Sequence, residues 1–355
     1  MNNKTGNNIT WQLISDIHTL SKIKEQWQSF AQQSSNPNPF SFPEWILNWY
    51  QVYWQKNWEL ATLVGYINNE LVLVFPFYIQ HSRQWPHLKV MYPLGQGEPE
   101  EAEISSEYCD VIISSRFENI ILLELIEKLA ELSVDQIICN AVLQNSHIIK
   151  FLEKAYEYKA PTSHYRYRIN CSKWTLQDLS KNTRSRYKRS NNQLKKINAK
   201  FHWVNSEDYM RYTALLIEYH QSLWEGRGYK GAFSHPNFKS FHNNYRSQHS
   251  VKISAITVDN IPIAINYYFS DETTLYFYQC GWDSNNYANF SLGLALHLWS
   301  IENCHHKYYD FMMGDIKHSY KSKYGAQQEP MTNIAIEIKP RKVFINKLIR
   351  RIISL

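Results

Sequence analysis

The spacing of hydrophobic positions along the chain switches repeatedly between the period of a helix and that of a strand. In the first half this pattern predicts, in order, a strand at 9–14, helices at 20–30 and 42–54, strands at 59–67, 70–79 and 108–114, a helix at 120–132, a strand at 136–141, a helix at 146–156 and a strand at 165–171. Ser41 is the expected N-cap of the second helix, and Pro43 lies in its first turn. Asn68-Asn69 predicts a tight hairpin.

The second half repeats the same series. Its pattern predicts a strand at 201–204, helices at 209–224 and 237–247, strands at 251–258, 261–269 and 274–282, a helix at 292–305, a strand at 308–312, a short helix at 317–324 and a strand at 333–338. Asp259-Asn260 is the expected turn of the hairpin. The repetition predicts a mixed α/β fold of two tandem domains, 1–174 and 175–340, followed by a helix at 341–355.

Composition narrows the class of protein. The chain has 355 residues, 44% of them hydrophobic and 20% charged, which is typical of a folded soluble protein with room for two domains. The five cysteines form no CxxC pair, so we expect neither a disulfide framework nor a zinc site. The first ten residues lack the apolar core of a signal peptide, and the longest apolar run, Leu71 to Ile79, is too short to span a membrane. We therefore expect a cytoplasmic location.

The basic character of the chain comes from one segment. Residues 181–200 hold eight cations and no acid, whereas the whole chain has a formal net charge of +6. No base-reading motif accompanies this segment, so nucleic acid is not the expected partner. Arg184, Arg186 and Arg189 are the expected contacts to an anionic acceptor or to donor phosphates, and a merely solvated helix is the alternative.

Several blocks of sequence, in this order and spacing, resemble the CelD/BcsL-type branch of the GNAT acyltransferases, which is associated with cellulose and envelope polysaccharide biosynthesis and related to Fem-type aminoacyl transferases. The blocks are PFSFPEW at 39–45, RSRYKRS at 184–190, HQSLWEGRG at 220–228, IPIAINYYF at 261–269, YQCGWD at 278–283, SLG at 291–293 and DFMMGDIKHSYKSKYG at 310–325. The resemblance implies two GNAT-like domains, with the donor site in the second. It implies acetyl-CoA or another acyl-CoA as donor and no metal. Leu292 stands where such relatives often have proline.

The passage from 279 to 296 is the expected donor site, because a helix N-terminus offers unpaired N–H groups and partial positive charge to a pyrophosphate. Asn289, Ser291 and Gly293 would line it, unless they simply begin an ordinary capped helix. Backbone groups of Gln279, Cys280 and Gly281 would polarise the thioester carbonyl. Gly281 marks either a bulge that opens the sheet or the end of a strand.

His220 is the candidate general base, because it flanks the apolar stripe of its helix and matches the resembling motif. A core histidine bonded to a carbonyl is the other reading of the same position. Trp224 and Arg227 of the same motif are expected to contact the substrate. The 12 tryptophans and 25 tyrosines of the chain suit sugar stacking, although large cores use them as well.

Asp310 interrupts an apolar strand, where a carboxylate needs a cationic partner, and Lys321 or Arg227 could supply it. We expect a structural ion pair first and orientation of the active site second. By resemblance, Tyr320 would protonate the departing thiolate, and Lys321 would hold a phosphate or the acyl carbonyl.

These observations favour an acyl-CoA-dependent N- or O-acyltransferase acting on a small molecule, a sugar or a cell-envelope precursor. Two alternatives stay open: a Fem-like transferase that uses aminoacyl-tRNA, and a non-catalytic RNA- or polysaccharide-binding protein. The tail, 341–355, predicts a basic amphipathic helix that either lies on the inner face of a membrane as a peripheral contact or docks on the protein itself.

Overall fold

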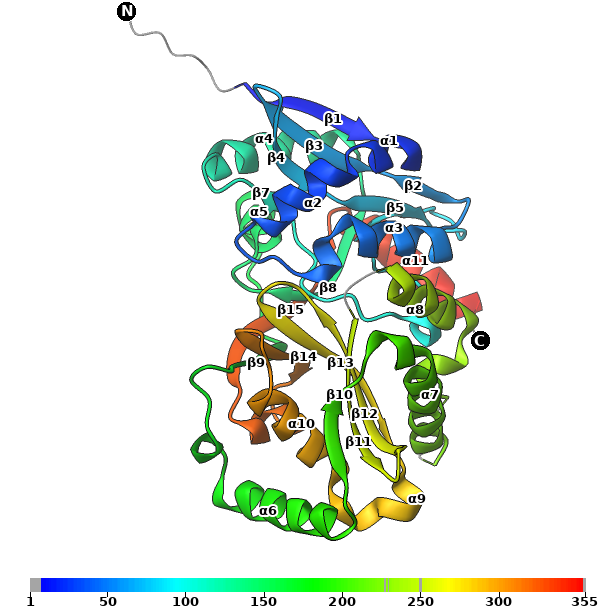
Figure 1. Ribbon diagram of the computed structural model, residues 1–355. Helices are drawn as coiled ribbons and strands as arrows, with labels where there is room; N and C mark the ends of the chain where they lie inside the picture. The colour runs from blue at the N-terminus through cyan, green and yellow to red at the C-terminus, as the bar shows by residue number, and fades with distance from the viewer. Residues whose placement is uncertain (1–7, 227, 229, 249–250, 354–355) are drawn as a thin grey trace, which may run out of the picture. The chain divides into compact units, whose positions relative to one another are not determined.

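The chain folds into two compact units (Figure 1), and the computed structural model describes residues 8–226, 228, 230–248 and 251–353. Unit 1 comprises residues 1–99, 103–163 and 331–355. Unit 2 comprises residues 100–102 and 164–330.

Unit 1 contains most of the elements that the first half predicts, together with the unpredicted strand β6, while the expected strand 108–114 is reduced to the short β7. Its helices are α1 (Ile17–Lys22), α2 (Lys24–Gln32), α3 (Pro43–Tyr53), α4 (Glu118–Glu131), α5 (His147–Tyr156) and α11 (Pro340–Ile353). Its strands are β1 (Thr10–Ile14), β2 (Trp58–Leu60), β3 (Thr62–Ile67), β4 (Glu70–Phe75), β5 (Phe77–His81), β6 (Lys89–Pro93), β7 (Ile112–Ile113), β8 (Gln136–Leu143) and most of β15 (Gln327–Glu337). The strand orders are β1-β3-β4-β7 and β15-β8-β6-β5-β2.

Unit 2 is built around a mixed sheet of order β10-β11-β12-β13-β14-β9. Its strands are β9 (His164–Asn170), β10 (Lys200–Trp203), β11 (Val251–Val258), β12 (Ile261–Ser270), β13 (Thr274–Trp282) and β14 (Tyr308–Asp315). Its helices are α6 (Lys181–Lys196), α7 (Tyr209–Glu225), α8 (Pro236–Gln248), α9 (Ser284–Tyr287) and α10 (Leu292–Glu302), and the 3-10 helix η7 (Tyr320–Tyr324) follows β14.

The predicted repeat is confirmed. In unit 1 the strands β1, β3, β4 and β7 lie in the same spatial order as β10, β11, β12 and β13 in unit 2. A helix follows each group, α4 in one unit and α10 in the other, and a further strand comes next, β8 or β14. The fold class is therefore mixed α/β with two tandem units of one plan.

Each unit takes one strand from the other half of the sequence, which the expected boundaries did not anticipate. β9, expected to close the first domain, pairs antiparallel with β14 in unit 2. β15, expected to finish the second domain, pairs from Met331 onward with β8 in unit 1. α11, expected as a separate tail, also belongs to unit 1. The compact units thus change over near residue 163 and near residue 331 rather than at 174 and 340.

Local sequence rules account for most boundaries. The turns at Asn68-Asn69 and Asp259-Asn260 have positive φ at both residues, as a two-residue hairpin requires. The prediction that Ser41 caps α3 was wrong: Phe42 is the N-cap and provides no side-chain bond, while Ser41 lies in a preceding 3-10 helix. The expected strands 59–67 and 70–79 each split in two, at Ala61 and Pro76, because β2 and β5 pair in a different sheet from β3 and β4.

Candidate active site

The most informative feature of unit 2 is the separation of two parallel strands. β13 and β14 pair only from Thr274–Tyr308 to Tyr276–Asp310. Beyond these residues β13 continues beside β12 to Trp282. β14 pairs with β9 along its length, with a break in register around Met312, which has a φ of 65°. The edge of β13 from residue 277 onward therefore diverges from β14 and leaves backbone groups available to an extended ligand.

The N-terminus of α10 lies at the end of this divergence. Ser291, its N-cap, adopts a left-handed conformation with a φ of 52° and makes no side-chain capping bond. Instead its hydroxyl accepts a hydrogen bond of 2.9 Å from Nε of Arg186 on α6. The Ser190 hydroxyl, also on α6, donates to the Phe290 carbonyl. The first-turn N–H groups of α10 and the Arg186 guanidinium together give a positively charged end suited to an anion.

Gly293 lies in the first turn of α10 and is not required by protein packing. A Cβ at this position would meet only the Trp282 ring, at 3.6–4.0 Å, which is ordinary contact. Asn289 lies one turn earlier, in an exposed 3-10 helix. The first turn of α10 at Gly293 thus lies against Trp282, the last residue of β13.

Tyr320 and Tyr324 bring two phenol rings toward the same region from η7. Tyr320 is 44% exposed as a residue, yet burial of its hydroxyl, and next the nearby Cys280 thiol, raise its pKa. It therefore stays protonated at neutral pH, as a proton donor must. The ammonium of Lys321 donates to the Met313 carbonyl. That contact ties Lys321 to Met313 of β14.

His297 is a residue of this region that the sequence analysis missed. It lies buried on α10, with Nδ1 2.7 Å from the Tyr309 hydroxyl. Its ring packs 4.4 Å from that of Phe277 and 6.5 Å from that of Tyr320. Burial lowers its pKa to about 3, so the ring is neutral. The only signal in the sequence is a histidine inside an otherwise apolar helix, LGLALHLW.

The buried carboxylate of Asp310 has a different partner from the expected ones. Arg166 on β9 donates to it through Nε and Nη2, both at 2.6 Å, and both side chains are buried. The second carboxylate oxygen accepts from the Met312 backbone N–H at 2.7 Å. Asp310 thus forms a structural ion pair and holds the irregular backbone where β14 leaves β13. Of the two expected partners, Lys321 is bonded to the Met313 carbonyl, and Arg227 lies outside the described residues.

His220 lies on α7, on the face that covers β13. Its Nε2 accepts a hydrogen bond of 2.9 Å from the Trp224 indole. Burial lowers its pKa to about 4, and the Gln279 side chain opposes this shift. Its Nδ1 is buried, and no partner for it is found among the residues that the structure describes. Burial therefore keeps the imidazole neutral, and the Trp224 indole holds it in place.

Glycine is required at position 281 by close packing against α7, which the sequence alone does not show. A Cβ there would lie 2.8 Å from the Leu216 carbonyl and 3.0 Å from the His220 nitrogen, both backbone atoms of α7. The bulge in β13 lies instead at Tyr278, where the register with β12 shifts. Gly281 thus lets α7 approach the sheet and is neither the bulge nor the strand end.

The three arginines of α6 have different roles. Arg186 reaches Ser291, whereas Arg184 turns back to the carbonyls of Gln177 and Leu179 and stabilises the start of its own helix. Arg189 is exposed. Arg184 is thus tied to its own backbone, away from the anion-binding end that Arg186 reaches.

All five cysteines are free thiols. In the part of the chain that the structure describes, no three His, Cys, Asp or Glu side chains have metal-site geometry. No helix among the same residues is long and apolar enough to cross a membrane.

Comparison with known proteins agrees with this geometry. Residues 181–322, all within unit 2, match the family model of the acetyltransferase (GNAT) domain. Unit 2 therefore carries a GNAT acetyltransferase domain, and the protein is an acyltransferase. No curated protein matches the sequence.

Solved structures of similar fold cover almost the whole chain. FemX superposes with a TM-score of 0.61 at 8% identity, over 94% of this chain and 98% of its own. A conserved protein of unknown function from Bacteroides thetaiotaomicron gives 0.54 at 10% identity, over 92% and 99%. The C-terminal domain of a protein described as a lysylphosphatidylglycerol synthetase from Agrobacterium fabrum gives 0.52 at 9% identity, over 92% and 95%. At such identities these likenesses concern the fold alone.

Proposed function

We propose that unit 2 transfers an acyl group from acyl-CoA to an amine or hydroxyl of a sugar-type or cell-envelope precursor. The observation that carries this proposal is the divergence of β13 from β14 beside the N-terminus of α10. An extended thioester donor needs a backbone edge to lie along and a positive end for its pyrophosphate, and this region offers both. The acceptor class and the CelD/BcsL branch rest on the sequence motifs.

Each step of the transfer has a candidate group. The α10 N-terminus and Arg186 would hold the pyrophosphate, and β13 backbone N–H groups near Gln279 to Gly281 would polarise the carbonyl. Tyr320 would return a proton to the leaving thiolate, since its raised pKa keeps it protonated. Asp310 and Arg166 would act as positioning residues that fix the strand separation.

His220 is the proposed base, with a condition that the geometry imposes. While the Trp224 N–H donates to Nε2, the neutral ring carries its proton on Nδ1, so neither nitrogen can accept another. Activation of an acceptor at His220 therefore requires Trp224 to release Nε2 when the acceptor binds. Without that release, His220 is a structural residue of α7 that holds the Trp224 indole.

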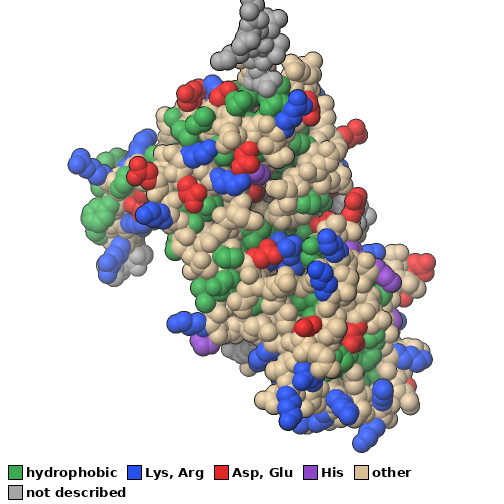
Figure 2. All heavy atoms as spheres, turned by 90° about the vertical axis from the view of Figure 1, so that its left-hand side faces the viewer, with side chains coloured by type: hydrophobic (Ala, Val, Ile, Leu, Met, Phe, Trp, Pro, Cys, Tyr) green, Lys and Arg blue, Asp and Glu red, His purple; other side chains and the backbone are tan. Residues whose placement is uncertain are grey.

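A Fem-like transferase using aminoacyl-tRNA is the second candidate, because α6 presents an uninterrupted basic face. Lys188, Arg189, Lys195 and Lys196 are exposed there, and the helix contains no acid. The lower end of the molecule in Figure 2, where Figure 1 places α6, is covered by Lys and Arg side chains. This face leads to the α10 N-terminus through Arg186 and would suit a polyanionic donor.

Thermal unfolding with acetyl-CoA or with RNA separates the two candidates. We expect saturating acetyl-CoA to raise the melting temperature, by an amount that grows with ligand concentration. RNA binding with a steep salt dependence and no effect of acetyl-CoA would favour the second candidate instead.

If acetyl-CoA is the donor, Tyr320→Phe should lower kcat about 10²-fold or more and leave the KM for acetyl-CoA nearly unchanged. Full turnover in this variant would remove Tyr320 from the mechanism.

A further inference from the structure

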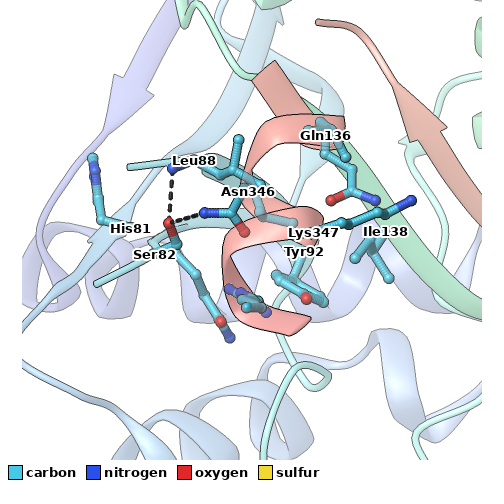
Figure 3. A pocket seen from close by; sticks show the side chains of 12 residues that line it. His81, Ser82, Leu88, Tyr92, Gln136, Ile138, Asn346 and Lys347 are labelled. Atoms are coloured by element: carbon cyan, nitrogen blue, oxygen red, sulfur yellow. Dashed lines mark hydrogen bonds between the residues drawn. The ribbon is translucent and has the colours of Figure 1, made fainter. Parts of the chain in front are cut away.

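α11 packs on unit 1 through one of its faces. Val343 is fully buried with Leu88 and Val90. Asn346 is also buried and donates to the Ser82 hydroxyl at 3.4 Å, and this contact is visible in Figure 3. Lys342 forms an ion pair of 2.6 Å with Asp135. A cavity of about 200 Å³ remains beside this face. The docked arrangement of the tail is thus observed.

The opposite face of α11 is apolar and exposed. Phe344 is 66% exposed, Leu348 50% and Ile352 63%. Residues four apart project from nearly the same side of a helix, so these three form one stripe, with Ile345 at its edge. Helices of globular proteins normally turn such a stripe to the core. A continuous apolar stripe left outside therefore indicates a surface that something covers.

The charges of α11 indicate what covers the stripe. Residues 340–355 contain five cations and no acid: Arg341, Lys342, Lys347, Arg350 and Arg351. At 100° per residue, Arg341 and Arg351 fall on the same side as Phe344 and Leu348. A second copy of the helix would bring these arginines against one another, which disfavours self-association. An anionic bilayer surface satisfies both the apolar stripe and its cations.

We propose that α11 binds an anionic phospholipid surface through Phe344, Leu348 and Ile352 while its Val343 face stays docked on unit 1. The two alternatives stated for the tail, docked helix and membrane helix, then describe opposite faces of one element. The proposal is independent of the acyl donor and acceptor, because no residue of unit 2 enters it.

Cosedimentation of the full chain with lipid vesicles tests the proposal. The vesicles contain phosphatidylcholine alone or with about 30% phosphatidylglycerol, at low and high salt. The test variant is Phe344→Ser with Leu348→Ser. The matched control is Ile120→Ser with Leu123→Ser, which removes two apolar side chains, 43% and 62% exposed, from α4, where acids predominate. All four positions are exposed, so thermal melts should be close to that of the parent protein.

We expect the parent protein to bind anionic vesicles at least about tenfold more strongly than neutral ones, with loss of binding at high salt. The α11 variant should lose about tenfold, and the α4 control should bind like the parent. The proposal is overturned if the parent stays in the supernatant at low salt, or if both variants lose binding equally. It is also overturned if light scattering shows a dimer that the α11 variant abolishes, since a second copy would then cover the stripe.

Discussion

At the scale of single residues, the sequence shows which side chain needs a partner more readily than it shows which residue that partner is. The sequence shows that Asp310 needs a cation, because a carboxylate within an apolar strand is costly to bury. The cation is Arg166, 144 positions away in the chain, and only the pairing of β14 with β9 brings the two together. Gly281 shows the same limit, because the α7 backbone that excludes a Cβ is distant in sequence.

Gly281→Ala should destabilise the protein by about 1–3 kcal/mol, because the added Cβ would overlap backbone atoms of α7 that cannot turn aside. Gly293→Ala is the matched control, since its Cβ meets only ordinary contact. Urea unfolding measures both changes. Equal midpoints for Gly281→Ala and the parent protein would show that the close approach of α7 is not a constraint.

Arg166→Met should cost about 3–5 kcal/mol, because it leaves the Asp310 carboxylate buried without its cation. The double variant Arg166→Met with Asp310→Leu should recover much of this loss, since it removes both charges. Denaturant titration of the three proteins forms the comparison. A double variant as unstable as the single one would mean that shape at this site matters more than charge.

At the scale of elements, local patterns suffice where the deciding interactions are local. The hairpins at Asn68-Asn69 and Asp259-Asn260, and most helices, lie where periodicity and turn residues place them. The exchange of β9 and β15 between the halves could not be predicted, because the sequence of a strand does not determine which other strand it pairs with. The candidate donor site shows the same difference. The helix α10 was predicted from its sequence, whereas the hydrogen bond between Arg186 and Ser291 was not.

Removal of residues 340–355 should destabilise unit 1 by about 2–5 kcal/mol. The truncation exposes Leu88 and Val90, on which Val343 packs, and it removes the ion pair of Lys342 with the buried Asp135. Chemical denaturation followed by far-UV circular dichroism measures the effect. An unchanged midpoint would contradict the docking of α11 on unit 1.

At the scale of the whole molecule, the two units should respond to pH in opposite ways. In unit 2, burial lowers the pKa of His220 to about 4 and those of His242 and His297 to about 3. The unfolded chain therefore takes up protons first as the pH falls below 6.5, and stability is lost. In unit 1, burial raises the pKa of Glu98 to about 7. Its stabilising contribution is present below pH 4.5 and is lost as the pH rises to 7.

Hydrogen exchange at pH 7, 6 and 5, corrected for intrinsic rates, should show weaker protection in unit 2 at the lower pH. Regions around Glu98 in unit 1 should be as well protected or better. His242→Leu should flatten the response of unit 2, because it removes one of the buried imidazoles. A parallel loss of protection in both units would argue against these assignments.

The central claim is that the α10 N-terminus and Arg186 form the donor site of unit 2, and calorimetric titration with CoA tests it most directly. We expect one CoA to bind per chain, and Arg186→Gln to weaken binding by about tenfold. Arg189→Gln is the matched control, because it removes the same charge from an exposed position of the same helix. The hydrogen bond to Ser291 comes from Arg186 and is kept in this variant. Binding by the parent, weakened only by Arg186→Gln, is the predicted result. No binding of CoA, or equal binding by all three proteins, would contradict it.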